Sequence, residues 1–158
     1  RDPAGAAEVF AVDVGTNNGV RDGMAVCSGR TIVGRIYRAG RTVSLVVGVR
    51  HPMFRVPVVV ESGGDKGVAW GTGIGLEVRF VPIEAEISAG GAVVSSDDNA
   101  DVPSRFLIGR VSDCKRDPVR LLWIIQVAPA PGTRNCEDLY IPLNWVGPAP
   151  VYVPKELR

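Results

Sequence analysis

The stretch GMAVCSGRTIVGRI, residues 23–36, decides the fold class of this chain. It reads as a short apolar strand, a turn, and a second apolar strand that a Gly-Arg pair interrupts. The pattern recurs later in the chain as GAVV at 91–94 and LIGRV at 107–111. A glycine inside a strand marks a bulge or a barrel corner. The repeat therefore predicts two similar small β-barrels of about 70 residues each, the alternative being a coincidence of common strand sequences.

The rest of the chain carries the same kind of strand signal. Apolar runs separated by Gly, Pro, Asn and Asp turns predict ten or eleven short strands and no amphipathic helix. Ser62–Asp65 is a hairpin signal between two of them. The fold class is therefore all-β, a barrel or a sandwich. The predicted strands cover residues 8–13, 24–27, 31–37, 43–49, 56–61, 67–70, 76–82, 92–95, 105–111, 121–129 and 139–143.

The repeat also predicts how the chain is divided. A length of 158 residues allows one domain, or two small ones that share a core. We expect a first subdomain over residues 8–75 and a second over residues 76–146, and we leave open that strands are shared or interleaved between them. Residues 1–7 and the proline-rich tail 147–158 are predicted to be flexible ends.

Composition and charge exclude several classes of protein. Hydrophobic residues are 46% of the chain and charged residues 22%, which is typical of a globular protein. A net charge of +1 and 6% aromatic residues offer neither the basic field nor the stacked rings that nucleic acid requires. The apolar runs are far shorter than the ~20 residues of a membrane span. Because residue 1 is Arg, we expect a soluble piece of a longer protein.

The sequence holds no pattern typical of a catalytic, cofactor or metal site. His51, the one histidine, lies beside Pro52 at a strand end, and no G-x-S-x-G motif is present. The run Ser95–Asp98 is explained by the turn preferences of Ser and Asp. Gly71–Gly75 lacks the Lys-Ser/Thr pair and the following helix of a phosphate loop. We therefore predict no enzyme, no catalytic residues, no cofactor and no bound metal.

The three cysteines do not indicate a metal site or a disulfide framework. Cys27, Cys114 and Cys136 are odd in number and lack C-x-x-C spacing. One disulfide beside a free thiol stays open.

Charge is distributed unevenly along the chain. Residues 21–55 contain seven arginines and one acid, Asp22, whereas residues 84–101 contain five acids and no Lys or Arg. Arginine is favoured at protein interfaces because its planar group pairs with carboxylates and stacks on rings. The pattern indicates either complementary contact surfaces or two solvated strand faces.

Several stretches together resemble one known family. They are DVGTNNGVRDGMAV (13–26), IVGRI (32–36), SLVVGVRHPMFRVPVVV (44–60) and KGVAWG (66–71), which are similar in order and spacing to the extracytoplasmic domain of MreC, the rod-shape-determining family. The second half departs from the pattern at Gly90-Gly91, Asp97 and Arg105. It returns to the pattern at 108–111 and at VAP (127–129).

The resemblance implies a non-catalytic scaffold of the bacterial cell-wall elongation complex. It implies two six-stranded barrels outside the inner membrane, anchored there by a segment absent from this chain. The implied partners are a second copy of the protein, as a homodimer or a higher assembly, a penicillin-binding transpeptidase, and, for the full-length protein, MreD and MreB. A periplasmic adaptor of the membrane-fusion type is the alternative, and it would require a long helical hairpin. A third class is a hydrolase that uses Ser96 and His51.

Partner contacts are predicted at exposed arginines and aromatic rings. The residues that we expect at the interface are Arg35, Arg38, Arg41, Phe54 and Trp70. Arg35 and Trp70 have a structural role as their alternative, because a buried tryptophan is more often core than contact.

Overall fold

The computed structural model describes residues 9–130, 139–143 and 151–152. This part of the chain contains twelve β-strands and one short 3-10 helix, η2 (Thr16–Asn18). The all-β class is therefore confirmed, and each of the eleven predicted strands overlaps an observed one. The strands are β1 (Val9–Val12), β2 (Ala25–Ser28), β3 (Thr31–Ala39), β4 (Ser44–Gly48), β5 (Arg55–Val60), β6 (Asp65–Gly71), β7 (Leu76–Arg79), β8 (Ala92–Ser95), β9 (Leu107–Asp117), β10 (Leu122–Pro129), β11 (Leu139–Ile141) and β12 (Val151–Tyr152).

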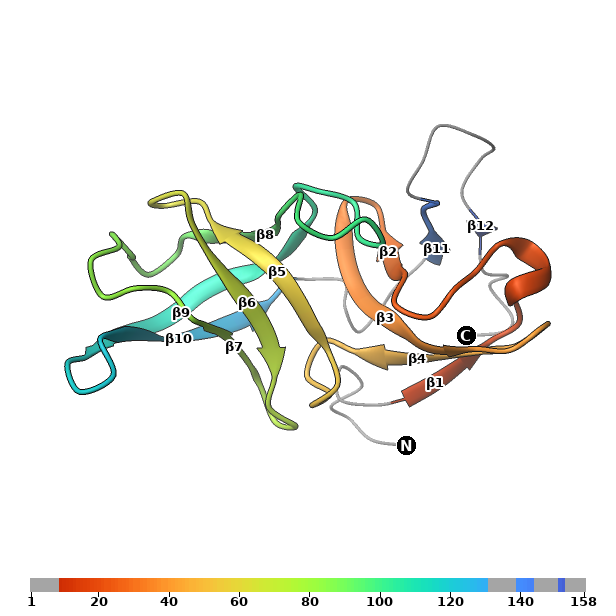
Figure 1. Ribbon diagram of the computed structural model, residues 1–158, viewed down its shortest axis with the longest axis horizontal. Helices are drawn as coiled ribbons and strands as arrows, with labels where there is room; N and C mark the ends of the chain where they lie inside the picture. Colours follow the sequence, from red (N-terminus) through yellow and green to blue (C-terminus); the bar gives the residue numbers. More distant parts are fainter. Residues whose placement is uncertain (1–8, 131–138, 144–150, 153–158) are drawn as a thin grey trace.

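Strands β5 to β10 close a six-stranded antiparallel barrel (Figure 1). Around the barrel, β5 pairs with β6, β6 with β7, β7 with β10, β10 with β9, β9 with β8, and β8 returns to β5. Alternate residues of β5, Val56, Val58 and Val60, are fully buried, as the two-residue period of a strand requires. Closure leaves none of the six strands as an open edge.

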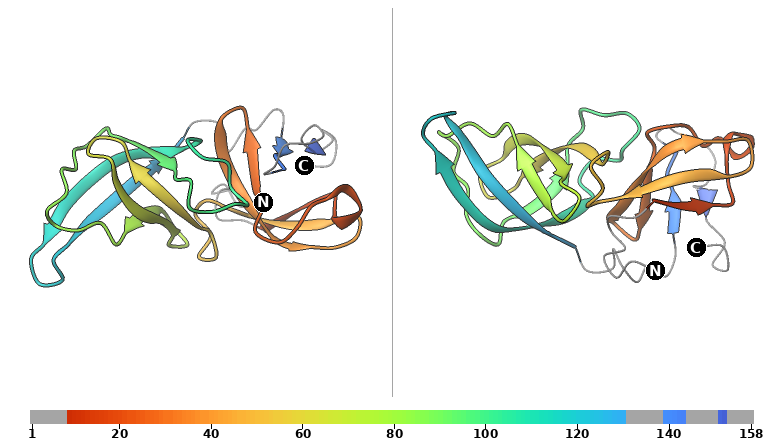
Figure 2. Two further views of the ribbon diagram at one scale, coloured as in Figure 1. Left: turned by 45° about the horizontal axis from the view of Figure 1, so that its top comes forward. Right: turned by 90° about the horizontal axis from the view of Figure 1, so that it is seen from below.

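The other six strands form a smaller unit beside the barrel (Figure 2). Their order is β1-β4-β3-β2-β11-β12, and each neighbouring pair is antiparallel. The barrel strands follow one another in the same way, as β7-β10-β9-β8-β5-β6, and a β6–β7 pairing then closes the barrel. Within the described residues no pairing joins β12 to β1. One of the two predicted barrels is therefore confirmed, and the other is an open sheet in the residues described.

The two units repeat the same hairpin in detail. Arg35 of β3 donates through Nε to the carbonyl of Gly23 at 2.8 Å, and Arg110 of β9 donates through Nη1 to the carbonyl of Gly90 at 3.2 Å. Gly23 and Gly90 both adopt a positive φ, of 93° and 87°. The structure thus aligns Gly23 with Gly90. The internal repeat in the sequence aligns Gly23 with Gly91, one residue later.

The strand glycines of the repeat also have one structural cause. The pairing of β3 and of β9 with its preceding strand shifts by one residue beside Gly34 and beside Gly109, which is the bulge that the sequence predicts. A Cβ atom at Gly34 would lie 2.5 Å from the carbonyl oxygen of Val47, and one at Gly109 would lie 2.3 Å from that of Ala128. Only glycine allows the neighbouring backbone to approach so closely.

Two apolar cores hold the molecule together. The larger core fills the barrel and includes Phe54, Leu76 and Ile125. Four buried residues of the smaller unit belong to this same core: Ala25, Cys27, Ile32 and Val47. The second core lies inside the smaller unit and includes Val12, Met24, Ile36 and Ile141. One face of the smaller unit therefore packs against the barrel, while the other covers its own core.

Backbone hydrogen bonds also join the two units. The Leu107 N–H donates to the Arg30 carbonyl at 2.8 Å, beside the parallel pair of Thr31 and Leu107. The Ala25 N–H donates to the carbonyl of Asp101 at 3.1 Å. Asp101 belongs to the loop between β8 and β9, which the sequence leaves without a role. This loop therefore connects the barrel to the smaller unit.

The pairing shows how the chain passes between the units. β5 and β6 precede the predicted boundary at residue 75, yet they close one barrel with β7 to β10, and β11 then returns to the smaller unit. The barrel is thus inserted into the smaller unit. In the predicted flexible end 147–158, Val151 and Tyr152 pair with β11 as β12, which corrects that expectation at these two residues. Residues 1–7 lie outside the described part of the chain.

Helix is scarce in the described ranges. They contain the three residues of η2 and no helix long and apolar enough to cross a membrane. Residues 9–130 also hold no helical hairpin, which is the element that the membrane-fusion adaptor alternative requires.

Candidate interaction surface

Trp70 lies on the outer face of the barrel between arginines from the two neighbouring strands. β6 places it opposite Arg55 of β5 and Glu77 of β7. The guanidinium carbon of Arg55 lies 3.9 Å from the centre of the Trp70 ring, and that of Arg79 lies 4.2 Å from it. Each such cation–π contact contributes roughly 0.5–2 kcal/mol. The Arg79 guanidinium also pairs with Glu77, so three strands together hold the indole in place.

Phe80 extends this aromatic surface toward solvent. Its ring meets that of Trp70 edge to face, with centroids 6.2 Å apart and an interplanar angle of 70°. The side chain is 56% exposed, and its backbone has a φ of 70°. This left-handed conformation costs a non-glycine residue roughly 1–2 kcal/mol. A strained backbone that presents a large ring to water is a feature of functional sites.

A hollow of about 470 Å³ lies beside Phe80, between β7 and β10. The half-exposed side chain of Ile124 lines it. The exposed Leu121, which also has a positive φ of 62°, immediately precedes β10. The side chains of Arg120 and Asp117, 3.9 Å apart, also line it, as do Glu77 and Arg79. The hollow therefore offers charged as well as apolar contacts, a mixture found at protein contact surfaces.

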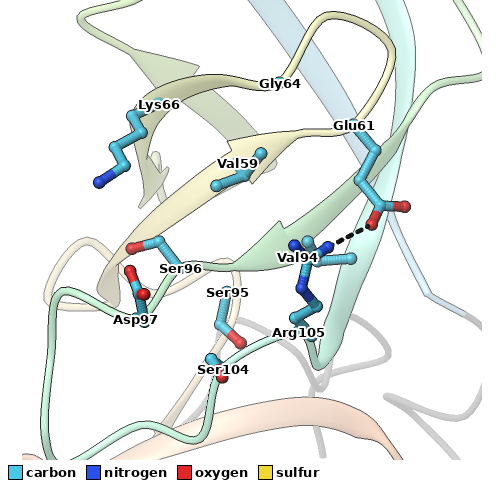
Figure 3. A pocket seen from close by; sticks show the side chains of 10 residues that line it. All are labelled: Val59, Glu61, Gly64, Lys66, Val94, Ser95, Ser96, Asp97, Ser104 and Arg105. Carbon is cyan, nitrogen blue, oxygen red and sulfur yellow. Dashed lines mark hydrogen bonds and ion pairs between the residues drawn. The ribbon is translucent and has the colours of Figure 1, made fainter.

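A second hollow, of about 650 Å³, opens over β5 and β8 (Figure 3). Val59 and Val94 line it, Lys66 lies on one side, and Arg105 lies on the other and points toward Glu61. The Arg105 and Glu61 side chains approach within 3.5 Å. Both partners of this pair are exposed to solvent, so the pair contributes little to stability.

The loop that follows β8 is held by serine hydroxyls. Ser95 is buried, donates to the carbonyl of Pro103 at 2.5 Å and accepts from the N–H of Phe106 at 3.0 Å. Hydrogen bonds from the Ser96 hydroxyl and from Lys66 keep the pKa of Asp98 below its ordinary value. The serines of this run therefore organise a turn, as their sequence pattern predicts.

Arg38 and Arg41 lie at the exposed end of the smaller unit. Arg38 pairs with Leu45 across β3 and β4, and its guanidinium lies 5.7 Å from the ring of Tyr37. Arg41 is exposed in the turn between β3 and β4. Both side chains are accessible to a partner, and their role as contacts stays a prediction.

Arg35 lies at the junction of the two units. Its guanidinium donates to the carbonyls of Gly23 and Arg55. Burial lowers the pKa of Arg35, and the charge of Asp101 partly opposes that shift. These bonds agree with the structural alternative for Arg35.

Phe54 has no surface to offer a partner. Its side chain is 0% exposed in the barrel core, just before β5. The structure thereby corrects the expectation that Phe54 contacts a partner. The physical reason is strand period, because Phe54 shares the inward face with Val56 and Val58.

The other reactive groups in the described part of the chain are His51, Cys27 and Cys114. His51 accepts a hydrogen bond at Nδ1 from the N–H of Met53, at 3.0 Å, in the segment before β5. Burial raises the pKa of the Cys27 thiol to about 12, and Cys114 is a half-buried free thiol. Cys136 lies outside the described residues. Among the residues that the structure describes, no group of three or more His, Cys, Asp or Glu side chains is placed to hold a metal ion.

The sequence predicts a contact at Trp70 but not at the residues around it, Arg55, Arg79 and Phe80. A signal was available, because the predicted hairpin pairs Val60 with Asp65, and counting back from that pair places Arg55 opposite Trp70. Phe80 has no such signal, because it follows the last residue of β7 and adopts a positive φ.

Comparison with known protein families identifies one match. The family described as rod shape-determining protein MreC, barrel core, matches residues 1–142. The chain is also 32% identical over 102 residues to the cell shape-determining protein MreC of Cereibacter sphaeroides, which is 64% of this chain and 34% of that protein. It is 26% identical over 141 residues to the MreC of Escherichia coli K12, which is 88% of this chain and 38% of that protein. The chain thus spans little more than a third of the curated relatives it matches.

Solved structures share the fold. The crystal structure of MreC from Pseudomonas aeruginosa gives a TM-score of 0.70 at 23% identity and covers 96% of this chain and 90% of that one. The structure of the major periplasmic domain of the cell shape-determining filament MreC gives 0.68 at 15% identity, with 82% of each chain covered. The complex between PBP2 and MreC from Helicobacter pylori gives 0.60 at 13% identity and covers 78% of this chain and 88% of that one. At these identities the likeness concerns the fold.

Proposed function

Since this chain belongs to the MreC family of rod shape-determining proteins, we propose that it is a non-catalytic scaffold of the bacterial cell-wall elongation complex. It contributes to cell shape by binding other proteins and transforms no substrate. The observation that carries this proposal is the extent of the family match, because residues 1–142 include the whole closed barrel and the smaller unit through β11.

The proposed location is the periplasmic side of the inner membrane. The similar domain of another MreC is a periplasmic one. A membrane anchor elsewhere in the full-length protein would hold the barrel there.

The proposed partners are a penicillin-binding transpeptidase and a second copy of the protein. The MreC from Helicobacter pylori, which shares this fold, forms a complex with PBP2. In the full-length protein we further expect contacts with MreD and, across the membrane, with MreB. A closed barrel suits a scaffold, because it presents side chains from rigid strands at fixed positions.

We also propose that the smaller unit is a second six-stranded barrel. Its strand order, its bulge beside Gly34 and the Arg35–Gly23 hydrogen bond match those of the closed barrel. Closure would require β1 to lie beside β12. Nuclear Overhauser contacts between backbone amides of β1 and β12 are the expected result, and exchange of β1 edge amides with solvent at the rate of an open strand would contradict it.

Arg38 and Arg41 are the proposed contacts on the smaller unit. The experiment is a pull-down of the cognate transpeptidase by the purified chain and by the double variant Arg38→Glu, Arg41→Glu. We expect the variant to retain much less transpeptidase, whereas Lys115→Glu, a charge reversal at an exposed position of β9, retains the normal amount. Unchanged retention by the double variant would remove both arginines from the interface. Failure of the unmodified chain to bind would contradict the scaffold function itself.

A further inference from the structure

We propose that the Trp70 surface docks an acidic segment of a partner protein that places an apolar side chain beside Phe80. We define this surface as Arg55, Trp70, Arg79 and Phe80, on the outer face of β5, β6 and β7. The inference rests on the proposed scaffold function, to which it adds the place of contact and the chemistry of the partner.

The Trp70 side chain is ordered before a partner binds. The guanidinium groups of Arg55 and Arg79 lie 3.9 Å and 4.2 Å from its ring centre and restrict its rotation. Binding a partner would therefore require little further ordering of this side chain, and the ordering of side chains opposes association. Tryptophan and arginine are also the residues that most often dominate the binding energy of protein interfaces.

A second tryptophan shows what a purely structural role looks like in this barrel. Trp123 also carries a stacked arginine, Arg116, at 4.4 Å. Its ring is 8% exposed, and its indole N–H donates to the carbonyl of Ala85 at 3.0 Å. Trp70 differs, because it is partly exposed and its N–H has no hydrogen-bond partner in the described part of the chain. That N–H is available to a carbonyl or carboxylate of a partner.

The charge of the surface favours an acidic partner. Arg79 is paired with Glu77, but Arg55 has no carboxylate partner among the residues that the structure describes. One positive charge is thus unmatched beside two aromatic rings. A carboxylate placed at the edge of the Trp70 ring would pair with Arg55, and exclusion of water on binding would strengthen that pair.

The hollow beside Phe80 is the reason why we propose an apolar side chain in the partner segment. Its volume of about 470 Å³ leaves room for a side chain next to the carboxylate. Phe80 and Ile124 would contact the apolar part of that side chain, while charged residues form much of the remaining lining. The left-handed backbone of Phe80 holds its ring beside this hollow. There the ring is exposed to solvent and is not part of the core.

A second copy of this chain fits the surface less well than a different protein. The acidic stretch 84–101 is the region that a second copy would present. Two of its acids are already paired, Asp98 with Lys66 at 3.3 Å and Asp101 with Arg21 at 2.7 Å. Self-association through these acids would require exchange of existing ion pairs.

The test is the affinity of the cognate transpeptidase's extracytoplasmic region for four forms of the chain. We expect Arg55→Glu and Trp70→Ala each to weaken binding by about tenfold or more, as truncation at a central contact does. Binding by the unmodified chain should weaken with rising salt, and Arg55→Glu should reduce that salt dependence. Arg30→Glu is the matched control, because Arg30 stacks on the largely buried Phe106 at 4.8 Å, and it should bind normally.

Thermal melting of each variant separates loss of contact from loss of fold. If Trp70→Ala melts early, Trp70→Phe replaces it, since it keeps a ring between the two arginines but removes the indole N–H. Weaker binding by a folded Trp70→Phe supports the inference, and unchanged binding by both Trp70→Phe and Arg55→Glu overturns it while leaving the scaffold function intact.

Two further measurements distinguish other occupants of the surface. Sedimentation of the chain alone reports self-association, and co-sedimentation with phosphatidylglycerol vesicles reports membrane contact. If Arg55→Glu lowers self-association or vesicle binding and leaves transpeptidase binding unchanged, the surface binds a second copy or a membrane, and the inference is wrong. No transpeptidase binding by the unmodified chain would overturn both the inference and the scaffold function.

Discussion

Arg35 donates a hydrogen bond through Nη1 to the backbone carbonyl of Arg55, and this bond ties the smaller unit to the strand that carries the Trp70 surface. The same guanidinium donates through Nε to the carbonyl of Gly23 at 2.8 Å. One side chain therefore connects β3, the turn before β2, and β5. The Arg55 guanidinium stacks on the Trp70 ring, while the Arg55 backbone carbonyl accepts the hydrogen bond from Arg35.

Replacing Arg35 should loosen the junction between the units. Arg35→Met keeps most of the aliphatic stem and removes two hydrogen bonds to backbone carbonyls, each of which contributes about 1 kcal/mol or more when the donor is charged. We expect the free energy of unfolding in urea to fall by roughly 2–3 kcal/mol. Arg38→Met, at an exposed position of the same strand, is the control and should change it by less than about 0.5 kcal/mol. Equal stability of the two variants would contradict a joining role for Arg35.

Gly109 should not tolerate a side chain. A Cβ atom there would lie 2.3 Å from the Ala128 carbonyl oxygen, so Gly109→Ala must separate β9 from β10. We expect a loss of more than about 2 kcal/mol in stability, measured by chemical denaturation. Gly75→Ala is the matched control, because its Cβ would meet the Thr72 hydroxyl oxygen at an ordinary 3.7 Å. A normal melting temperature for Gly109→Ala would show that the barrel backbone is less constrained than its hydrogen bonds indicate.

Ser95 should contribute more to the stability of the fold than its neighbour Ser96. Ser95→Ala would leave the carbonyl of Pro103 and the N–H of Phe106 without their hydroxyl partner in a buried setting. The expected cost is about 1–3 kcal/mol, together with faster amide exchange at Phe106. Ser96→Ala removes two hydrogen bonds, one to the carboxylate of Asp98 and one from its N–H, but both groups belong to an exposed residue that water can satisfy, so it should cost much less. The prediction fails if both variants exchange at the same rate.

The Cys27 thiol should resist alkylation in the folded protein. Its ionisation in the unfolded chain should lower the free energy of unfolding at alkaline pH. Burial raises its pKa from 9.0 to about 12, so the native thiol stays protonated and unreactive at pH 8, whereas the half-buried Cys114 reacts with iodoacetamide. In the unfolded chain the thiol ionises near its ordinary pKa, and ionisation then favours unfolding. The contribution of Cys27 to stability is complete below pH 9 and is lost as pH rises toward 12. Denaturation of Cys27→Ala across this range should show a weaker alkaline loss, and mass spectrometry of modified peptides checks the reactivity.

Much of the fold could be predicted because strand period and turn residues act locally. The Ser62–Asp65 turn and the strands on either side follow from neighbouring residues alone, and the structure has them as expected. The return of β11 to β2 could not be predicted in this way, because Leu139 and Ser28 meet only after the whole barrel has been traversed. Such long-range pairing depends on which edge remains free, and no local pattern records it.

The expected contact residues depend on residue type and on strand alternation. Residue type alone favours contacts at Phe54 and Trp70, with a structural role as the alternative for Trp70. Strand alternation separates them, because Phe54 shares the inward face with Val56, whereas Trp70 shares the outward face with Val68 and Lys66. The positive φ values of Phe80 and Leu121 have no sequence signal of this kind, because non-glycine residues rarely adopt them.

The insertion of the barrel has a consequence for biosynthesis. All six barrel strands are contiguous in the chain, so they can associate as soon as residue 129 has been translated or exported. The neighbouring sheet must wait for Leu139 and Ile141, which fill its own interior and cover the exposed side of β2. In a polypeptide delivered from its N-terminus, β1 to β4 thus emerge before the barrel but reach their native state after it, and ribosome-associated or secretion chaperones would encounter these strands longer than the barrel strands.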